Sequence, residues 1–449
     1  MKILTVSAGD FSLTYGGGQT YVRRLVAELC TRKEIEVSIL SFFSNEARQK
    51  TVELNGRNIN IHYLPISSED NRIIALLKEI SPDIVHIHGN KAQMCKVCRN
   101  MNIPNVVTAH HGGILCPAGA LLNSKDEICH VPLNHRDCLK CCLHNIRFCG
   151  FLYPVLRFIP QSVYIALGKL LRKIPFIYCL TPVGSAALSI KCKKEEWMSI
   201  CGNCSLIIAP SYAIKQAMEQ NGMPPNKIIV LPHGVPQPDN VPPFPAVKNQ
   251  KVKFFYVGRI CYVKGLHLLL EAFHRAEAPH AELHLIGGAG NQHEKSYMEH
   301  LKRKYRSDSR ILWHGKIKED QIAKAISSYH VLIHPTICME TFGLNIAEAL
   351  SMGKWALSTR CGGAEMQILE GKNGWLIPPN AISALKDKIK QIADSPPCCS
   401  PSIFRYQSIE KHVKSLLDIF KNLIKSPTNK HSIGAVSYTH LRAHETGRN

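Results

Sequence analysis

Two carboxylates in the second half of the chain have a spacing that could bind a ligand: Glu340 and Glu348, separated by seven residues. The apolar run Tyr329–His334 before them is typical of a buried parallel strand. Residues Leu344–Met352 are typical of a helix, which Gly353 would end. Glu340 is therefore expected on the loop from strand to helix, and Glu348 about one turn inside the helix.

The carboxyl end of a strand is where open α/β sheets bind ligands. The first N–H groups of a helix also favour an anion there. Two carboxylates beside such a helix end suit a ligand with both hydroxyls and phosphates, such as a nucleotide sugar. On spacing alone, a simpler interpretation is favoured, in which Glu340 is a helix-end charge and Glu348 lies on the surface.

Two cations follow an earlier strand of the same half. Residues Phe254–Gly258 are typical of a strand, and Arg259 and Lys264 lie in the loop after it, where they would clamp phosphates. The next strand, Glu282–Gly287, ends in a turn rich in glycine, which brings the backbone near a ligand.

The first half begins with a similar unit. A strand at Lys2–Ser7 is followed by Gly16, Gly17 and Gly18, and then by an amphipathic helix from about Thr20 to Thr31. The glycines let backbone N–H groups approach a ligand closely. The loop has neither the GxGxxG spacing of dinucleotide-binding proteins nor the lysine of a P-loop, so the sequence disfavours both classes.

A histidine, His110, ends a predicted strand at the ligand edge of the first half. A histidine at this place could act on a hydroxyl or on a phosphate. A structural histidine that caps the strand explains the sequence equally well.

Cysteine is abundant, with eighteen residues, twelve of them between Cys95 and Cys204. The chain begins without a secretory signal, so we expect reduced thiols in the cytoplasm rather than a disulfide framework. A structural zinc site would need ligands close together, and the cysteines that could supply it are Cys116, Cys129, Cys138 and Cys141. The alternative is a thiol-rich, locally packed insertion.

The net charge of +21 predicts an anionic partner, either nucleic acid or an anionic membrane, although a merely basic surface is also consistent. The basic residues are dispersed and no nucleic-acid-binding motif is present, so a nucleic-acid partner is disfavoured. Residues 151–180 are apolar with interspersed Arg and Lys. They could lie on an anionic bilayer as a peripheral segment, or form a helical flap over a cleft.

Strands and helices alternate throughout, which predicts an α/β fold with two Rossmann-like, doubly wound domains facing a central cleft. We expect a first domain over 1–236 with the cysteine-rich insertion at about 112–180, and a second domain over 250–400. A helix over 401–425 follows. Residues 426–449 include a stretch that resembles translated adapter sequence, and we exclude this tail from the fold. No apolar run is long enough for a membrane-spanning helix.

Taken together, Gly16-Gly17-Gly18, Gly258-Arg259 with Lys264-Gly265, the Gly287-Gly288 turn, and Glu340-x7-Glu348 with Phe342-Gly343 resemble the retaining family 4 (group 1) glycosyltransferases of GT-B fold. The cysteine-rich insertion is similar to one in a subset of this family. The resemblance implies an enzyme whose second domain binds a nucleotide sugar, with UDP or GDP, and whose first domain binds a glycan or lipid-linked acceptor. It implies no required cofactor and a role in cell-surface polysaccharide synthesis.

The resemblance also implies roles for single residues. Arg259 and Lys264 would contact the diphosphate, Glu348 the ribose hydroxyls, and Glu340 would lie beside the transferred sugar. His110 matches the family histidine near the reacting centre, although this chain has two histidines there, His110 and His111. The implied catalytic set is Glu340, His110, Lys264 and Arg259, and the implied donor-binding set is Gly17, Gly18, Gly258, Arg259, Lys264, Gly287, Phe342, Gly343, Leu344 and Glu348.

The sequence has no Asp-x-Asp pair for a divalent ion, so a metal-independent transfer fits. Two other classes share some of these features. A non-catalytic nucleotide-sugar-binding protein would keep the same motifs, and only turnover would separate it from an enzyme. A basic nucleic-acid-binding protein would explain the charge, and salt-dependent oligonucleotide binding would identify it.

Overall fold

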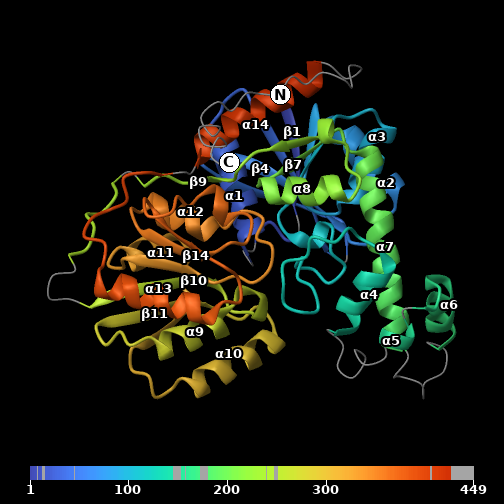
Figure 1. The fold of residues 1–449 in the computed structure, drawn as a ribbon. Helices are drawn as coiled ribbons and strands as arrows, with labels where there is room; N and C mark the ends of the chain where they lie inside the picture. The colour runs from blue at the N-terminus through green and yellow to red at the C-terminus, as the bar shows by residue number, and fades with distance from the viewer. Residues whose placement is uncertain are drawn as a thin grey trace, which may run out of the picture.

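The fold is that of a computed structural model, which describes residues 1–7, 9–12, 16–44, 46–144, 153–156, 158–171, 181–238, 240–246, 251–404 and 407–425. One mainly parallel and one parallel sheet, each with flanking helices, form the two halves of the molecule (Figure 1). The predicted α/β architecture with two doubly wound sheets is therefore confirmed.

The first sheet has eight strands in the order β3-β4-β2-β1-β5-β6-β7-β8, and only the β3–β4 pair is antiparallel. Its central strands are short apolar runs that are buried along their whole length, as expected for a sheet covered on both faces. The strands are β1 (Lys2–Ser7), β2 (Glu36–Ser44), β3 (Arg48–Leu54), β4 (Arg57–Pro65), β5 (Ile84–Ile87), β6 (Asn105–Thr108), β7 (Leu206–Ala209) and β8 (Ile228–Val230).

Helices cover both faces of this sheet and bury their apolar sides against it. They are α1 (Gly17–Leu29), α2 (Asp70–Ile80), α3 (Lys91–Asn100), α7 (Thr181–Asn203) and α8 (Tyr212–Gln220). The long helix α7 extends beyond the sheet, where α4 (His135–His144), α5 (Tyr153–Leu156) and α6 (Gln161–Leu171) gather around it at the lower right of Figure 1. A small apolar cluster that includes Leu139, Leu143 and Ile190 joins α4 to α7.

The second sheet has six parallel strands in the order β12-β11-β10-β13-β14-β15. The strands are β10 (Val252–Arg259), β11 (Ala281–Gly288), β12 (Ile311–Gly315), β13 (Val331–His334), β14 (Trp355–Thr359) and β15 (Gly374–Ile377). The flanking helices are α9 (Leu266–Arg275), α10 (Gln292–Lys304), α11 (Glu319–Ile326), α12 (Leu344–Ser351) and α13 (Ile382–Asp394).

The last helix, α14 (Ile409–Lys425), returns to the first half, as its red ribbon beside the blue N-terminal strands shows (Figure 1). It buries Val413, Leu416 and Phe420 in the same apolar cluster as Tyr21 of α1. Just before it, β16 (Gln407–Ser408) pairs with β9 (Gly234–Val235). The predicted 401–425 helix therefore begins later than expected and completes the core of the first half.

Within the parts of the chain that the structure describes, no helix is both long and apolar enough to cross a membrane. The predicted peripheral segment 151–180 is described only at 153–156 and 158–171, where it forms α5 and α6. The tail 426–449 lies outside the described residues.

Candidate active site

The loop between β13 and α12 joins the two halves of the molecule. Thr341 on this loop donates a hydrogen bond from its hydroxyl to the backbone carbonyl of His110, at 2.9 Å. The aromatic rings of Phe342 and His233 lie 5.5 Å apart at the same contact. The carboxyl edge of the second sheet therefore lies against the end of β6 in the first sheet.

Glu340, which precedes Thr341 on this loop, forms an ion pair with Lys264. The Glu340 main chain is fixed by an N–H donated to the carbonyl of Cys361 at 2.7 Å. Burial would raise the pKa of the Glu340 carboxyl, but the Lys264 ammonium and the His334 side chain together outweigh burial and hold that pKa well below its usual range. Burial likewise would lower the pKa of Lys264, but the Glu340 carboxylate raises it overall. Both groups are therefore charged at neutral pH.

Arg259 lies at the end of β10, next to the turn that follows β11. Its guanidinium is 3.6 Å from the carboxylate of Glu294, and its side chain is 52% exposed. Glu294 also accepts the backbone N–H of Gly290 at 2.7 Å. Arg259 is thus held beside the glycine turn and still has exposed surface that a ligand could contact.

Two glycines of this region are required by close backbone approach. A Cβ on Gly287 would lie 1.8 Å from the carbonyl oxygen of Gly258 on the neighbouring strand, and the φ of Gly287 is +141°. A Cβ on Gly265 would lie 1.9 Å from the carbonyl oxygen of Pro335. No other residue fits either position. Gly287 allows the ends of β10 and β11 to pack closely, and Gly265 allows the loop after β10 to pack against the residue that follows β13.

Glu348 points from α12 to the first half of the molecule. Its carboxylate accepts a hydrogen bond from the guanidinium of Arg24 on α1 at 2.6 Å, and both side chains are largely buried. Sequence reasoning missed Arg24, because nothing in its surroundings on α1 marks it as a partner for a residue more than 300 positions away.

His110 is buried in a group of aromatic and histidine rings rather than standing alone. Its Nε2 lies 2.7 Å from Nδ1 of His88, and its ring is close to those of Tyr21 and His233. Burial lowers the pKa of His110 well below its ordinary value, so the ring is neutral. Sequence reasoning also missed His88, although it follows the buried strand β5 just as His110 follows β6.

His111 has a different place. Its Nδ1 accepts the backbone N–H of Gly113 at 3.1 Å and caps the short turn that follows β6. Burial lowers the pKa of His111 to about 4. The structure therefore gives His111 a local structural contact, whereas His110 lies at the contact between the halves.

The glycines Gly17 and Gly18 at the start of α1 also lie at the contact between the two halves. A Cβ on Gly17 would lie 3.4 Å from the side chain of Leu344, and a Cβ on Gly18 would lie 3.2 Å from His110. The N-terminus of α1 thus meets the N-terminus of α12. The predicted residues nearest to the contact between the halves are Glu340, Lys264, His110, Gly17, Gly18, Phe342, Gly343 and Leu344. The remaining predicted residues lie on adjoining strands and helices and are Arg259, Gly258, Gly287 and Glu348.

The predicted zinc ligands Cys116, Cys129, Cys138 and Cys141 are all described, and all are free thiols. Among the described residues, no group of three or more His, Cys, Asp or Glu side chains could hold a metal ion. Burial raises the pKa of Cys138 to about 12, which keeps this thiol protonated. The zinc prediction is therefore not supported, and the alternative of a thiol-rich packed insertion agrees with these contacts.

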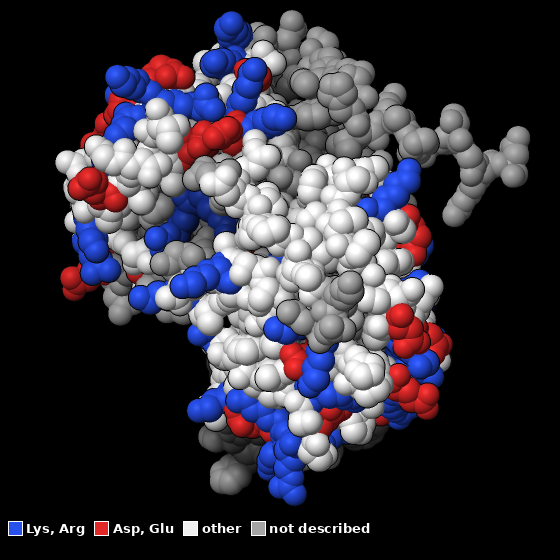
Figure 2. All heavy atoms as spheres, turned by 90° about the vertical axis from the view of Figure 1, so that its left-hand side faces the viewer, with Lys and Arg blue, Asp and Glu red and all other residues white. Residues whose placement is uncertain are grey.

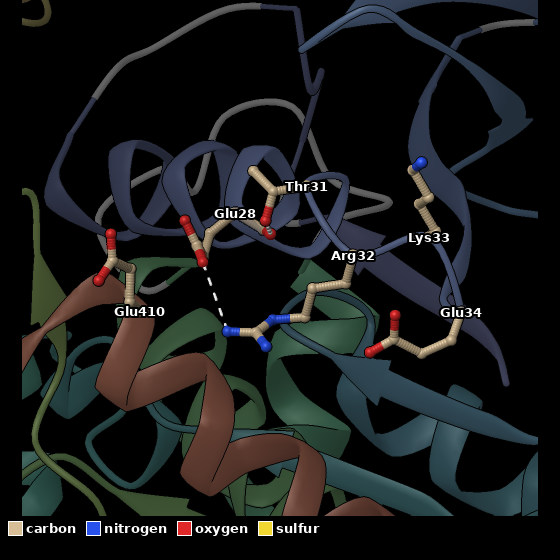
Figure 3. Close-up of a pocket in the computed structure, with 6 residues that line it drawn as sticks. All are labelled: Glu28, Thr31, Arg32, Lys33, Glu34 and Glu410. Atoms are coloured by element: carbon tan, nitrogen blue, oxygen red, sulfur yellow. Dashed lines mark hydrogen bonds and ion pairs between the residues drawn. The ribbon is translucent and has the colours of Figure 1, made fainter.

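A different pocket opens at the far end of α1 (Figure 3). It is lined by Glu28, Thr31, Arg32, Lys33, Glu34 and Glu410. Glu28 in the last turn of α1 and Arg32 just beyond the helix form an ion pair of 3.5 Å, and Glu410 faces them from α14. None of the predicted site residues lines this pocket. In Figure 2, Lys and Arg side chains are spread over the visible face and also gather around a hollow in it.

Comparison with known proteins gives this geometry a context. Residues 239–426 match the family described as Glycosyl transferases group 1, and residues 15–127 match Glycosyltransferase Family 4. The chain is 27% identical over 140 residues to the gpi3 component of the phosphatidylinositol N-acetylglucosaminyltransferase of Schizosaccharomyces pombe. This match covers 31% of this chain and 30% of that protein.

Two further relatives are similar over longer or comparable stretches. A component of the human phosphatidylinositol N-acetylglucosaminyltransferase is 24% identical over 253 residues, 56% of this chain and 46% of that protein. The D-rhamnosyltransferase WbpZ of Pseudomonas aeruginosa is 27% identical over 145 residues, 32% of this chain and 36% of that protein. Each of these three matches spans less than half the length of the relative.

Solved structures are similar over nearly the whole chain. Anabaena Alr3699/HepE in complex with UDP and glucose has a TM-score of 0.56 at 15% identity, covering 96% of this chain and all of that one. Sucrose-phosphate synthase from Thermosynechococcus elongatus has a TM-score of 0.58 at 16% identity, covering 95% and 96%. This protein therefore has the GT-B fold, and its residues 15–127 and 239–426 are similar to a family 4 and a group 1 glycosyltransferase domain.

Proposed function

We propose that this protein is a retaining glycosyltransferase that moves a sugar from a UDP- or GDP-sugar to a glycan or lipid-linked acceptor. The observation that carries the proposal is the Lys264–Glu340 ion pair, held at the N-terminus of α12 and in contact with the end of β6 at His110. A cation, a carboxylate and a helix end at one point suit a diphosphate and the sugar attached to it.

The names of the similar proteins support this substrate class. The fungal and human relatives are components of N-acetylglucosaminyltransferases, the bacterial one is a rhamnosyltransferase, and the similar Anabaena structure holds UDP and glucose. Because the Lys264–Glu340 pair lies in the second half, about 250–400, we infer that this half binds the donor and that the first half, about 1–236, binds the acceptor. We further propose a role in cell-surface polysaccharide synthesis, in the cytoplasm at a membrane surface.

In the proposed reaction, the bond between the sugar and the diphosphate breaks and negative charge develops on the leaving phosphate oxygens. Lys264, Arg259 and the N–H groups at the start of α12 stabilise this charge. A preorganised group of this kind contributes about 3 kcal/mol to the transition state. The acceptor hydroxyl attacks from the same face as the leaving group, and a phosphate oxygen of the donor takes its proton.

The two glutamates have different tasks in this proposal. Glu348 binds the ribose hydroxyls, and Arg24 holds one of its carboxylate oxygens at 2.6 Å. Glu340 lies beside the transferred sugar, where its carboxylate can accept hydrogen bonds from the sugar hydroxyls. His110, neutral because of its burial, faces the sugar from the first half.

The test is a panel of UDP-, GDP- and ADP-sugars in a thermal-shift assay, because a ligand that binds only the folded protein raises the melting temperature. We expect a rise with a UDP- or GDP-sugar, which Glu348→Ala abolishes. Donor hydrolysis or transfer is then measured with and without chelator. A protein that binds the donor but shows no turnover with any acceptor would contradict enzymatic activity. Loss of turnover with chelator would contradict metal independence.

A further inference from the structure

A buried histidine that the proposed reaction does not use lies behind Glu340. His334 is the last residue of β13 and is 2% exposed. Its Nε2 faces the carboxylate of Glu340 at 3.6 Å. This Nε2 has no hydrogen-bond partner among the described residues. An unpaired buried polar atom costs free energy, and the nearby group that could pair with this one is the Glu340 carboxylate.

The contacts of Asn345 determine which nitrogen of His334 carries the proton. The Asn345 side-chain nitrogen lies 2.9 Å from the backbone carbonyl of Val257, which can only accept, so this nitrogen is the amide NH₂ group. The same NH₂ lies 3.1 Å from Nδ1 of His334 and donates to it. Burial lowers the pKa of His334, so its ring is neutral. With Nδ1 as the acceptor, the single proton is on Nε2 and points to Glu340.

We propose that His334 is a positioning residue for Glu340, and that Asn345 holds it in the Nε2–H tautomer for this purpose. The inference rests on the proposed function. In the structure, Lys264 pairs with Glu340. A bound diphosphate attracts the Lys264 ammonium, and the Nε2–H of His334 is then an oriented donor beside the carboxylate. A shift of about 1 Å or less closes the present gap to a hydrogen bond.

The consequence for catalysis is that His334 keeps the Glu340 carboxylate oriented toward the sugar. A carboxylate that swings away from the sugar loses its productive geometry, and a misplacement of about 1 Å can cost about a hundredfold in rate. His334→Leu should therefore lower kcat by about tenfold to a hundredfold, while the donor KM stays nearly constant. His334→Gln places an amide N–H near the same position and should restore most of the rate.

His330→Leu is the matched control. His330 is also fully buried, lies just before the same strand, and accepts the backbone N–H of Lys253 at 3.0 Å through Nδ1. This contact ties it to β10 and not to Glu340, so its loss should lower the melting temperature without lowering kcat. A purely structural role for His334 would make the two leucine variants behave alike.

A double-mutant cycle with Glu340→Gln separates the inference from the proposed function. If His334 acts only through Glu340, His334→Leu should cause no further loss in the Glu340→Gln background. Full independent loss in that background overturns the inference. Normal turnover in Glu340→Gln overturns the proposed role of Glu340, whereas an impaired Glu340→Gln beside a fully active His334→Leu overturns the inference alone.

A spectroscopic measurement keeps the inference testable even if His334→Leu does not fold. Long-range ¹H–¹⁵N NMR of the intact protein, with His334 assigned through His334→Gln, reports which ring nitrogen is protonated. The expected result is a protonated Nε2 and a bare Nδ1, changed by Asn345→Leu. A protonated Nδ1 overturns the inference.

Discussion

At the scale of single residues, the clearest prediction concerns two cations, Arg259 at the end of β10 and Lys264 in the loop after it. Lys264→Ala and Arg259→Ala each remove a positive charge that would face the leaving diphosphate, and each should lower kcat by about a hundredfold or more. Steady-state transfer kinetics measure the change. Arg275→Ala is the control, because Arg275 pairs with Glu271 on the exposed side of α9. Near-normal turnover in both variants would show that the active site lies elsewhere.

The two glutamates should respond differently to substitution. Ribose contacts persist from the bound substrate to the transition state, so Glu348→Ala should raise the donor KM and leave kcat nearly unchanged. Glu340→Ala should lower kcat more than it weakens donor binding. Calorimetric donor binding combined with single-turnover rates separates the two effects. Equal losses of binding in both variants would contradict the assigned roles.

The sequence predicted most of the residues that meet at this site, because each follows a recognisable strand or precedes a recognisable helix. It did not predict Arg24, His88 or His334. The Arg24–Glu348 pair joins positions that are 324 residues apart, and such pairs depend on how the two halves dock. His334 was noted only as part of a buried strand, since its role depends on the amide orientation of Asn345.

At the scale of elements, Arg310 holds the end of α9. Its guanidinium donates to the backbone carbonyls of Phe273 and His274 in the last turn of the helix, and to those of Ala276 and Ala278 just beyond it. Asp308 holds the guanidinium in place at 2.7 Å. The hydrogen bonds from Arg310 lower the pKa of Asp308 to about 2.

This lowered pKa predicts a pH-dependent stability. Because the folded pKa lies below the unfolded one, Asp308 contributes stability above about pH 4, and this contribution disappears as the pH falls towards 2. Asp308→Asn should therefore cost about 2 kcal/mol at pH 6, and the difference from wild type should shrink below pH 4. Chemical unfolding followed by tryptophan fluorescence measures it. Asp394→Asn, at an exposed ion pair, is the control for the substitution itself and should change stability by no more than about 0.5 kcal/mol.

The last helix belongs to the core of the first half, which gives a prediction about stability. Phe420 on α14 is fully buried, and its ring lies 5.3 Å from that of His86. Phe420→Ala should destabilise the protein by about 3–5 kcal/mol. Lys421→Ala, on the exposed side of the same helix, should change stability by no more than about 0.5 kcal/mol. Equal melting temperatures for the two variants would contradict this packing.

The sequence predicted most strands of both sheets, because short apolar runs bounded by turns are a strong signal, but it missed β15 at the edge of the second sheet. It did not predict β3, which is polar and exposed along most of its length and forms through antiparallel pairing with β4. The start of α14 was also placed too early, because β16 pairs with β9 first. In both cases pairing between strands decided the structure, and local residue pattern did not.

At the scale of the whole molecule, α4, α5 and α6 stand apart from the two sheets, at the lower right of Figure 1. Apolar side chains of α6 are exposed there, with Val163 at 48% and Leu170 at 58%. The net charge of the chain is +21. An exposed apolar helix on a basic protein is the arrangement that favours attachment to an anionic membrane surface.

Vesicle sedimentation tests this attachment and, with it, the proposal of a lipid-linked acceptor. The protein should bind vesicles that contain anionic lipid, and binding should weaken as salt screens the charge. Val163→Asp combined with Leu170→Asp should reduce binding, because each removes exposed apolar area and adds repulsion from the lipid headgroups. Met198→Asp, at a similarly exposed position on α7, is the control and should bind like wild type. Equal binding to neutral vesicles, or the same loss in both variants, would mean that α6 is not the segment that meets the membrane.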